Sequence, residues 1–417
     1  MKVMTLFEPD LFISDSKDEK EGLLTQHLKW WLRIVSIGEL PGTTNKLLAF
    51  CRESMFALVI CVSVLVQLLA DSAVSGDLFG VRIGLAVYAS VFSILLFQLR
   101  RCNIQACLRL LVQVSSVLDV HAKPRAKAHL ASTARRSATV IRYYVVYACL
   151  AEVASVLALC IPRPYWHKFL ASGMHQMLGG SWEILASVVR WCLTLVQCVN
   201  GVFCVVADYT VVLLIFTTFL SMAAMFEAIS EALEVSDKKE KYPHPHQFDS
   251  HPLKDSCNFV SPSKTGPCNR LWARLQSILT LASLQMDAAL SDLLPHILIA
   301  NVVVPLLSTV EMVLHGLESD VFAVGMAPLV LAVFVPLCLV GDAMGTARLH
   351  LTDKACAGPW LEETIEIRKL RLGMVQVSQG RGGCLGGIGI GKLDRETCAN
   401  ALKSWFSFLQ VLMNLVE

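Results

Sequence analysis

Long stretches of apolar residues constrain what this chain can fold into. A helix that crosses a bilayer needs about 20 mostly apolar residues, and residues 54–70 and 83–99 contain no charged side chain. Only 17% of the 417 residues are charged, below the roughly one quarter that is typical of soluble domains. We therefore expect an all-α membrane protein with seven transmembrane helices, at 54–70, 83–99, 138–160, 191–226, 293–310, 321–341 and 398–416.

The fourth span is the longest. Residues 191–207 and 209–226 are separated only by Asp208, and no Gly or Pro beside it would reverse the chain. At about 1.5 Å per residue this stretch extends about 54 Å, more than a bilayer core of about 30 Å requires. We expect one long helix that projects beyond the bilayer. Pro305 and Pro336 lie within spans five and six, where a proline kinks or punctuates a helix.

The distribution of Lys and Arg predicts the orientation, because cytoplasmic loops carry an excess of both. Four alternate segments hold 29 of the 36 basic residues, whereas the opposite loops hold only Arg163 and Lys168. The N-terminus is therefore predicted to be cytosolic and the C-terminus extracellular. This orientation excludes a G-protein-coupled receptor, whose N-terminus is external. The four basic segments are residues 1–46, 100–137, 227–292 and 343–397.

The loops also carry structural signals. Residues 101–120 and 269–290 keep a helical apolar period, so we expect these spans to continue into the cytosol as helices. Residues 236–268 are polar and rich in Pro and His, which predicts disorder. Glycines crowd residues 379–392 and predict a flexible or tightly turning approach to the last span. The expected order is a cytosolic segment (1–46), spans one to six (47–342) with long cytosolic loops at 100–137 and 227–292, a cytosolic anchor segment (343–397) and a seventh helix (398–417).

The last span carries a polar stripe. Lys403, Ser407, Gln410 and Asn414 recur at steps of four, three and four residues, which places them on one helix face. A polar stripe in lipid is costly, so it should face protein or water. One interpretation is a pore lined by several copies of this helix. The other is hydrogen bonding to helices of the same subunit, and the residues alone leave both open.

Charged residues within other spans form a second candidate site. Glu152 lies in the outer half of span three, Arg190 at the outer end of span four, and Glu311 near the outer end of span five. An isolated charge in mid-membrane costs roughly 2.5–3.5 kcal/mol, which pairing of Glu152 with Arg190 would relieve. The alternative is a purely structural ion pair, or an Arg190 that snorkels to the interface. The candidate lining of an external ligand cavity is Tyr88, Glu152, Arg190, Trp191, Gln197, Asn200 and Glu311.

Several function classes lack their sequence signals. No phosphate-binding Gly-rich loop, His-Glu-x-x-His or Gly-x-Ser-x-Gly sequence is present, so we expect neither an enzyme nor a cofactor. A net charge of +2 argues against a nucleic-acid binder. His244, His246, His251, Cys257 and Cys268 share one loop, but their spacing matches no metal-ligand set, so no metal site is expected.

The end of the chain resembles the insect (arthropod) gustatory receptor family. In that family a Leu-Asp-Arg sequence precedes a last helix that carries Thr-Tyr, five hydrophobic residues and Gln-Phe. Here residues 389–397 (Gly-Ile-Gly-Lys-Leu-Asp-Arg-Glu-Thr) look like the first part, and residues 407–415 look like the second. Residues 31–38, followed by Pro41, are similar to the segment before the family's first span. The family's Thr-Tyr corresponds to Ser407-Phe408 here, and its Gln-Phe corresponds to Asn414-Leu415. Gln410 interrupts the run of hydrophobic residues between these pairs. The position of the Glu that is typical of sugar receptors is occupied by Leu409.

The resemblance implies a taste receptor at the plasma membrane that acts as a tetrameric, ligand-gated, nonselective cation channel. Four seventh helices would form the pore, spans two to six would enclose the ligand, and the cytosolic ends of spans four to seven would join the subunits. The family's gate residue corresponds to Asn414, and nearby Leu412 and Leu415 would close the pore by dewetting. The implied partners are a small-molecule tastant, membrane lipid, and other gustatory receptor subunits in a homo- or heterotetramer, without nucleic acid.

Two alternatives remain. The first is an odorant receptor of the same fold, which the sequence Leu393-Asp394-Arg395 disfavours. The second is a polytopic secondary transporter. A transporter would act as a monomer and depend on a midplane charge such as Glu152 rather than on the terminal stripe. No internal repeat is evident in the sequence, which weighs against a transporter built from repeats.

Overall fold

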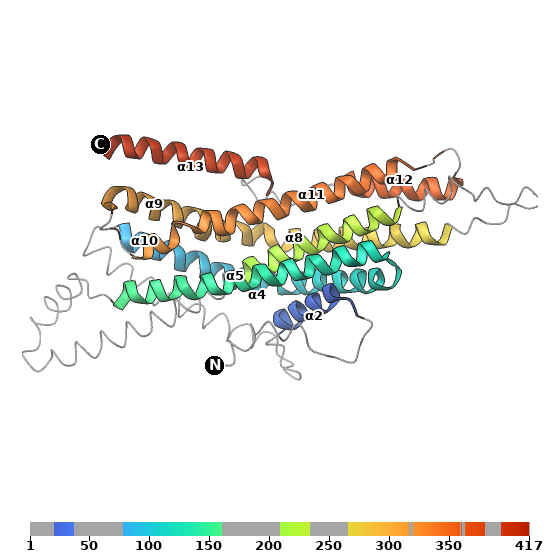
Figure 1. The fold of residues 1–417 in the computed structure, drawn as a ribbon, viewed down its shortest axis with the longest axis horizontal. Coiled ribbons are helices and arrows are strands. Elements are labelled where there is room, and N and C mark those ends of the chain that lie inside the picture. The colour runs from blue at the N-terminus through green and yellow to red at the C-terminus, as the bar shows by residue number, and fades with distance from the viewer. Residues whose placement is uncertain are drawn as a thin grey trace, which may run out of the picture.

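The structure, a computed structural model, is a bundle of long helices that run along one axis (Figure 1). Its described residues contain helices and turns but no strand. Three of the described helical stretches, Tyr209–Leu233, Arg270–His315 and Ala323–Cys356, are long and apolar enough to cross a membrane. The prediction of an all-helical, multi-pass membrane protein is confirmed. The structure describes residues 21–36, 78–160, 209–233, 266–316, 319, 321–358, 360, 363–379 and 393–416.

Helices α4 (Leu78–His121) and α5 (Pro124–Cys160) form an antiparallel hairpin. The predicted second span and its extension over 101–120 belong to one unbroken helix, α4. Pro124 starts α5 favourably, because its fixed φ suits the first turn of a helix, where its missing N–H would have no partner anyway. Residues 100–137, expected as a loop with a helical first part, are therefore helical on both sides of a short turn at 122–123.

The helical stretches predicted as spans five and six each contain a π-helical turn that ends two residues before a proline. Helix α8 (Gly266–Leu298) continues through η2 (Ile299–Val303) into α9 (Val304–His315), which has Pro305 in its first turn. Helix α10 (Val321–Met326) is followed by η4 (Val330–Phe334) and α11 (Val335–Cys356), which has Pro336 in its first turn. Because proline lacks the N–H of a regular helical bond, each span changes its bonding pattern there.

Some predicted boundaries differ from the structure, and others lie outside it. Helix α8 starts at Gly266, so residues 266–268 are helical rather than part of a disordered segment. Pro267 suits the first turn of a helix, because its fixed φ is helical and its missing N–H would have no partner there. The fourth span is described only as Tyr209–Leu233, and its first half, 191–207, lies outside the described residues. The first span, 54–70, lies outside them as well.

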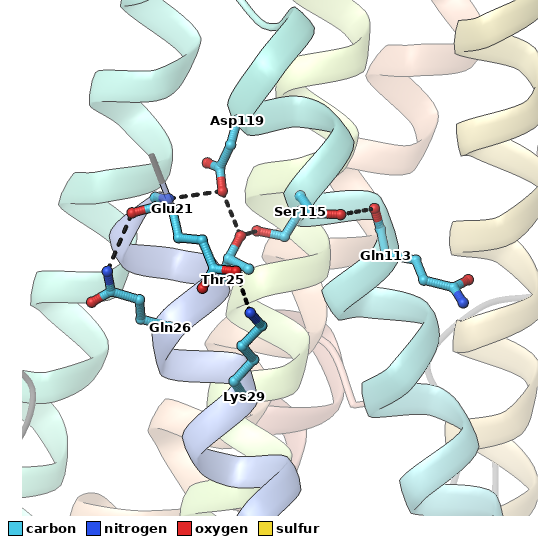
Figure 2. A network of polar contacts seen from close by, with 9 residues as sticks. Glu21, Thr25, Gln26, Lys29, Gln113, Ser115 and Asp119 are labelled. Atoms are coloured by element: carbon cyan, nitrogen blue, oxygen red, sulfur yellow. Dashed lines mark hydrogen bonds and ion pairs between the residues drawn. The ribbon is translucent and has the colours of Figure 1, made fainter. Parts of the chain in front are cut away.

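The helix α2 (Leu23–Ser36) lies against α4 and is fixed there by a polar cluster (Figure 2). Asp119 of α4 accepts hydrogen bonds from the Gly22 backbone N–H (3.0 Å) and the Thr25 hydroxyl (2.6 Å). Thr25 also shares a 2.6 Å hydrogen bond with Ser115. The carboxylate of α4 thus caps the first turn of α2, a place where negative charge is favourable. Leu28 and Trp31 of α2 are buried in the core.

Helix α12 (Ile365–Gln379) lies at the end of the bundle that also holds the α4–α5 turn (Figure 1). The buried Arg371 Nε lies 2.6 Å from the Glu363 Oε1. Gly358 leaves room for the guanidinium, because a Cβ there would come within 2.3 Å of the Arg371 Cζ. Gln276 of α8 donates to the Met374 carbonyl at 2.9 Å. These contacts hold α12 against α8 and against the end of α11.

Candidate functional site

The last helix, α13 (Arg395–Val416), begins at the Leu-Asp-Arg sequence. Leu393 is buried, and the Asp394 Oδ1 accepts a 2.8 Å hydrogen bond from the Thr397 backbone N–H, as a helix N-cap does. The Arg395 Nε lies 2.8 Å from the Asp342 Oδ2 of α11. The three residues of the motif therefore start α13 and attach it to the sixth span.

A close backbone contact reinforces this attachment. A Cβ on Gly341 of α11 would lie 2.2 Å from the Leu393 carbonyl oxygen, so only glycine allows the approach. Cys338, one turn before Gly341, and Cys398 of α13 are both buried in the same core. The base of α13 is therefore held to α11 by packing, an ion pair and a helix cap together.

The polar stripe of α13 faces away from its own subunit. The helix packs against the core through Cys398, Ala401, Leu402 and Trp405. At about 100° per residue, the stripe lies on the opposite side of the helix. Within the described part of the chain, the four stripe side chains are exposed and form no hydrogen bond with another helix: Lys403, Ser407, Gln410 and Asn414. This arrangement does not support bonding of the stripe within one subunit.

Large apolar side chains flank the stripe. Phe406 and Val411 are each 59% exposed, and Phe408 and Met413 about half exposed. Figure 1 shows α13 along the outside of α9 and α11, with its C-terminal end on the side of α9. Among the expected gate residues, Leu412 is half-buried on the packing side, and Leu415 lies in the last turn. Most of the circumference of α13 is thus open to contact with lipid, water or another chain.

A buried ion pair joins α4 and α9, which belong to the predicted second and fifth spans. The Arg82 Nη2 of α4 is 3.6 Å from the Glu311 Oε2 of α9, and the Arg82 side chain is fully buried. The His315 Nδ1 lies 3.2 Å from the other carboxylate oxygen of Glu311. We predicted Glu311 as a site residue but not its partner. Arg82 directly precedes the uncharged run of the predicted second span. A charged residue at the end of such a run is the sequence feature that could have indicated a partner for Glu311.

The other candidate ligand residues are not brought to this pair. Tyr88 is 42% exposed, and its ring lies 4.5 Å from Phe92 and 5.8 Å from His296 of α8. Glu152 lies in α5. The expected Glu152–Arg190 pair remains a prediction, since Arg190 lies outside the described ranges. Three further candidates lie outside them as well: Trp191, Gln197 and Asn200. Within the described ranges, no group of His, Cys, Asp and Glu side chains could hold a metal ion.

Two tyrosines of α5 hold the sixth span, a contact that sequence reasoning missed. Tyr144 donates its hydroxyl to the Ala332 carbonyl within η4, and Tyr147 donates to the Gly325 carbonyl at 2.8 Å. In a regular α-helix the Ala332 carbonyl would bond to the N–H of residue 336, which is Pro336 and has none. Tyr144 thus supplies a donor at the position where the helix lost one.

Comparison with solved structures identifies the fold as that of insect olfactory receptors. The insect olfactory receptor OR5 from Machilis hrabei matches with a TM-score of 0.67, over 94% of this chain and 99% of that chain. The same receptor in complex with eugenol matches with a TM-score of 0.56, over 94% and 97%. The sequence identities are only 11% and 10%. No protein-family model matches the sequence, and no curated protein matches it.

Proposed function

We propose that this chain is a subunit of a ligand-gated, nonselective cation channel that detects small molecules at the plasma membrane. The observation that carries the proposal is the outward-facing polar stripe of α13. Polar side chains on a membrane helix are costly in lipid, so this face requires water or a partner. A ring of four such helices, one from each subunit of a tetramer, supplies both. The insect olfactory receptor fold is compatible with this assembly.

The proposed conduction path follows the stripe from the anchored base of α13 to its free end. Lys403 lies nearest the base, and Ser407, Gln410 and Asn414 follow toward the C-terminus. Because a lysine repels cations, we place Lys403 at the cytosolic mouth. Leu412 and Leu415 lie within one turn of Asn414 and are proposed to close the pore by dewetting. Leu412 faces its own subunit here, so this role requires α13 to rotate.

We propose a tastant as the ligand, on the strength of the Leu393-Asp394-Arg395 sequence and its structural role at the start of α13. An odorant is the second candidate, because the matching solved structures are olfactory receptors and one of them binds eugenol. The ligand is proposed to bind among the outer parts of the spans, near Tyr88 and Glu311. The further lining residues stay as predicted from the sequence: Glu152, Arg190, Trp191, Gln197 and Asn200.

The test is whole-cell current from cells that express the full chain, during application of a panel of tastants and volatile odorants. The variants are Asn414→Leu and Gln410→Leu on the stripe. Met413→Leu, an exposed apolar position beside the stripe, is the matched control. We expect a ligand-evoked current whose ion selectivity or pore block changes in the stripe variants and not in the control, at equal surface protein.

Two outcomes would contradict the proposal. Currents that are indifferent to Asn414→Leu and Gln410→Leu would remove the stripe from the pore. Ligand uptake by a monomeric protein, without current and with dependence on Glu152, would favour a transporter. The active compounds distinguish taste from odour, since tastants and odorants are applied separately.

A further inference from the structure

Helix α5 has two faces with different surroundings. Its buried face packs into the core through Ala126, Leu130, Ala134, Ser137 and Ile141. At about 100° per residue, these five positions lie within one broad sector of the helix. The opposite sector is exposed along the same length. Its side chains are therefore available to contact whatever surrounds the protein.

The exposed face changes character between Arg142 and Tyr143. On one side of this boundary it carries the exposed arginines Arg135, Arg136 and Arg142. On the other side it carries Tyr143 (72% exposed), Val146 (58%) and Leu150 (64%). Exposed aliphatic side chains on a membrane helix face lipid chains, and tyrosines gather at the interface with water. Arg142 directly precedes this apolar stretch, and Arg135 and Arg136 lie about two helical turns before it.

Within the described ranges, no acidic side chain forms an ion pair with Arg135, Arg136 or Arg142. The nearby carboxylates are directed to earlier positions of α5. The Glu231 Oε1 lies 3.8 Å from the Arg125 Nε, and the Glu227 Oε2 lies 3.3 Å from the His129 Nε2. The cluster thus presents three positive charges on one helix face over about 10 Å, given a rise of about 1.5 Å per residue. Phosphate groups are the complementary partners, because a guanidinium binds them with two parallel hydrogen bonds.

We propose that Arg135, Arg136 and Arg142 form a binding site for the phosphorylated headgroup of an anionic phospholipid in the cytosolic leaflet. The leaflet assignment rests on the predicted orientation, in which residues 100–137 are cytosolic and Arg142 lies near the cytosolic end of the third span, 138–160. That leaflet carries the anionic lipids, and basic residues beside a transmembrane helix bind them. The apolar band of Tyr143, Val146 and Leu150 continues the site toward the acyl chains, so a lipid fits it better than a soluble anion.

Lipid binding to the purified full-length protein in neutral detergent tests this site. The probes are fluorescent phosphatidylinositol bisphosphate, phosphatidylserine and phosphatidylcholine, and the readout is fluorescence polarization. For the bisphosphate lipid, we expect the triple variant R135Q/R136Q/R142Q to bind about 100-fold more weakly than wild type, because each basic residue contributes a factor of about five near an anionic surface. R125Q is the matched control, since Arg125 is 90% exposed on the same helix but lies ten residues, about 15 Å, further from the apolar band than Arg135. It should bind as wild type does.

A second measurement needs no variant. Binding of the bisphosphate lipid to wild type should weaken as salt is raised, because ionic screening reduces exposed charge interactions. Equal binding of the triple variant and wild type would overturn the proposal, as would equal binding of phosphatidylcholine. A free inositol phosphate that displaces the lipid at equal affinity would make this an anion site and not a lipid site. The readout is binding rather than current, so failure here leaves the channel proposal intact.

Discussion

Arg82 and Glu311 face each other across the second and fifth spans, with 3.6 Å between the Nη2 and Oε2 atoms. Arg82 is fully buried and Glu311 is 7% exposed. A charge in such surroundings is unfavourable by itself, and two opposite charges compensate each other. The pair therefore fixes how α4 and α9 lie against each other near the proposed ligand region, and His315 extends it toward solvent.

Removal of one charge from this pair should destabilise the fold. Glu311→Gln takes away the carboxylate that Arg82 faces, and breaking a buried pair costs about 3–5 kcal/mol. We expect a lower thermal unfolding temperature in detergent and less protein at the cell surface. The double variant Arg82→Leu/Glu311→Leu is the control, because it removes both charges and should recover much of the stability. A double variant that is less stable than Glu311→Gln would contradict this explanation.

Gly341→Ala should displace the base of α13. The new Cβ would meet the Leu393 carbonyl oxygen at 2.2 Å, which no real contact permits, so the backbone must move. We expect ligand-evoked currents to change in their dose dependence while the surface protein stays near the wild-type level. Gly345→Ala, one turn further along α11, is the matched control, because a Cβ there meets nothing within 4 Å. Identical behaviour of both variants would contradict a special role for this contact.

The sequence predicted features that depend on local periodicity, and it failed for those that depend on partners far along the chain. The 83–99 span and the 101–120 extension follow from apolar spacing, and α4 contains both. The step of four, three and four residues placed the α13 stripe on one face, but its outward direction depends on which face meets α9 and α11. No local pattern indicated that Arg82 would lie beside Glu311, more than 200 residues away in the sequence.

Acid should loosen α2. Burial lowers the pKa of His27 to about 4 from an ordinary value near 6.5. The undocked helix therefore binds a proton more readily than the docked one. The stabilisation is fully present above about pH 6.5 and is lost as the pH falls toward 4. We expect faster amide hydrogen exchange in residues 23–36 at pH 5 than at pH 7.5, after correction for intrinsic rates.

The variant His27→Asn tests whether this histidine is the cause. An asparagine cannot take up a proton in this range, and it keeps a donor near the Ser137 hydroxyl, which lies 3.1 Å from the His27 Nε2. The exchange of α2 in this variant should no longer differ between pH 5 and pH 7.5. A variant whose pH response equals that of wild type would show that His27 is not the cause.

Tyr144→Phe should weaken the sixth span at its π-helical turn. The Ala332 carbonyl accepts the Tyr144 hydroxyl, and Pro336 cannot supply the regular helical donor. Loss of a partner from a fully buried carbonyl costs about 1–3 kcal/mol, and the partly buried Ala332 carbonyl should lose less than the upper value. Tyr143→Phe is the matched control, because Tyr143 is 72% exposed on the lipid-facing side of the same helix. We expect a lower unfolding temperature for Tyr144→Phe alone.

The double variant Tyr144→Phe/Pro336→Ala distinguishes this mechanism from a simple loss of packing. An alanine at position 336 restores an N–H that can bond to the Ala332 carbonyl, so the double variant should be more stable than Tyr144→Phe. If the loss of stability came from poorer packing of residue 144 and not from the unbonded Ala332 carbonyl, Pro336→Ala would bring no recovery. The helix α11 that follows η4 also carries Asp342, which pairs with Arg395 at the start of α13. We therefore expect Tyr144→Phe to shift the ligand dose that opens the channel, and the double variant to reverse part of this shift.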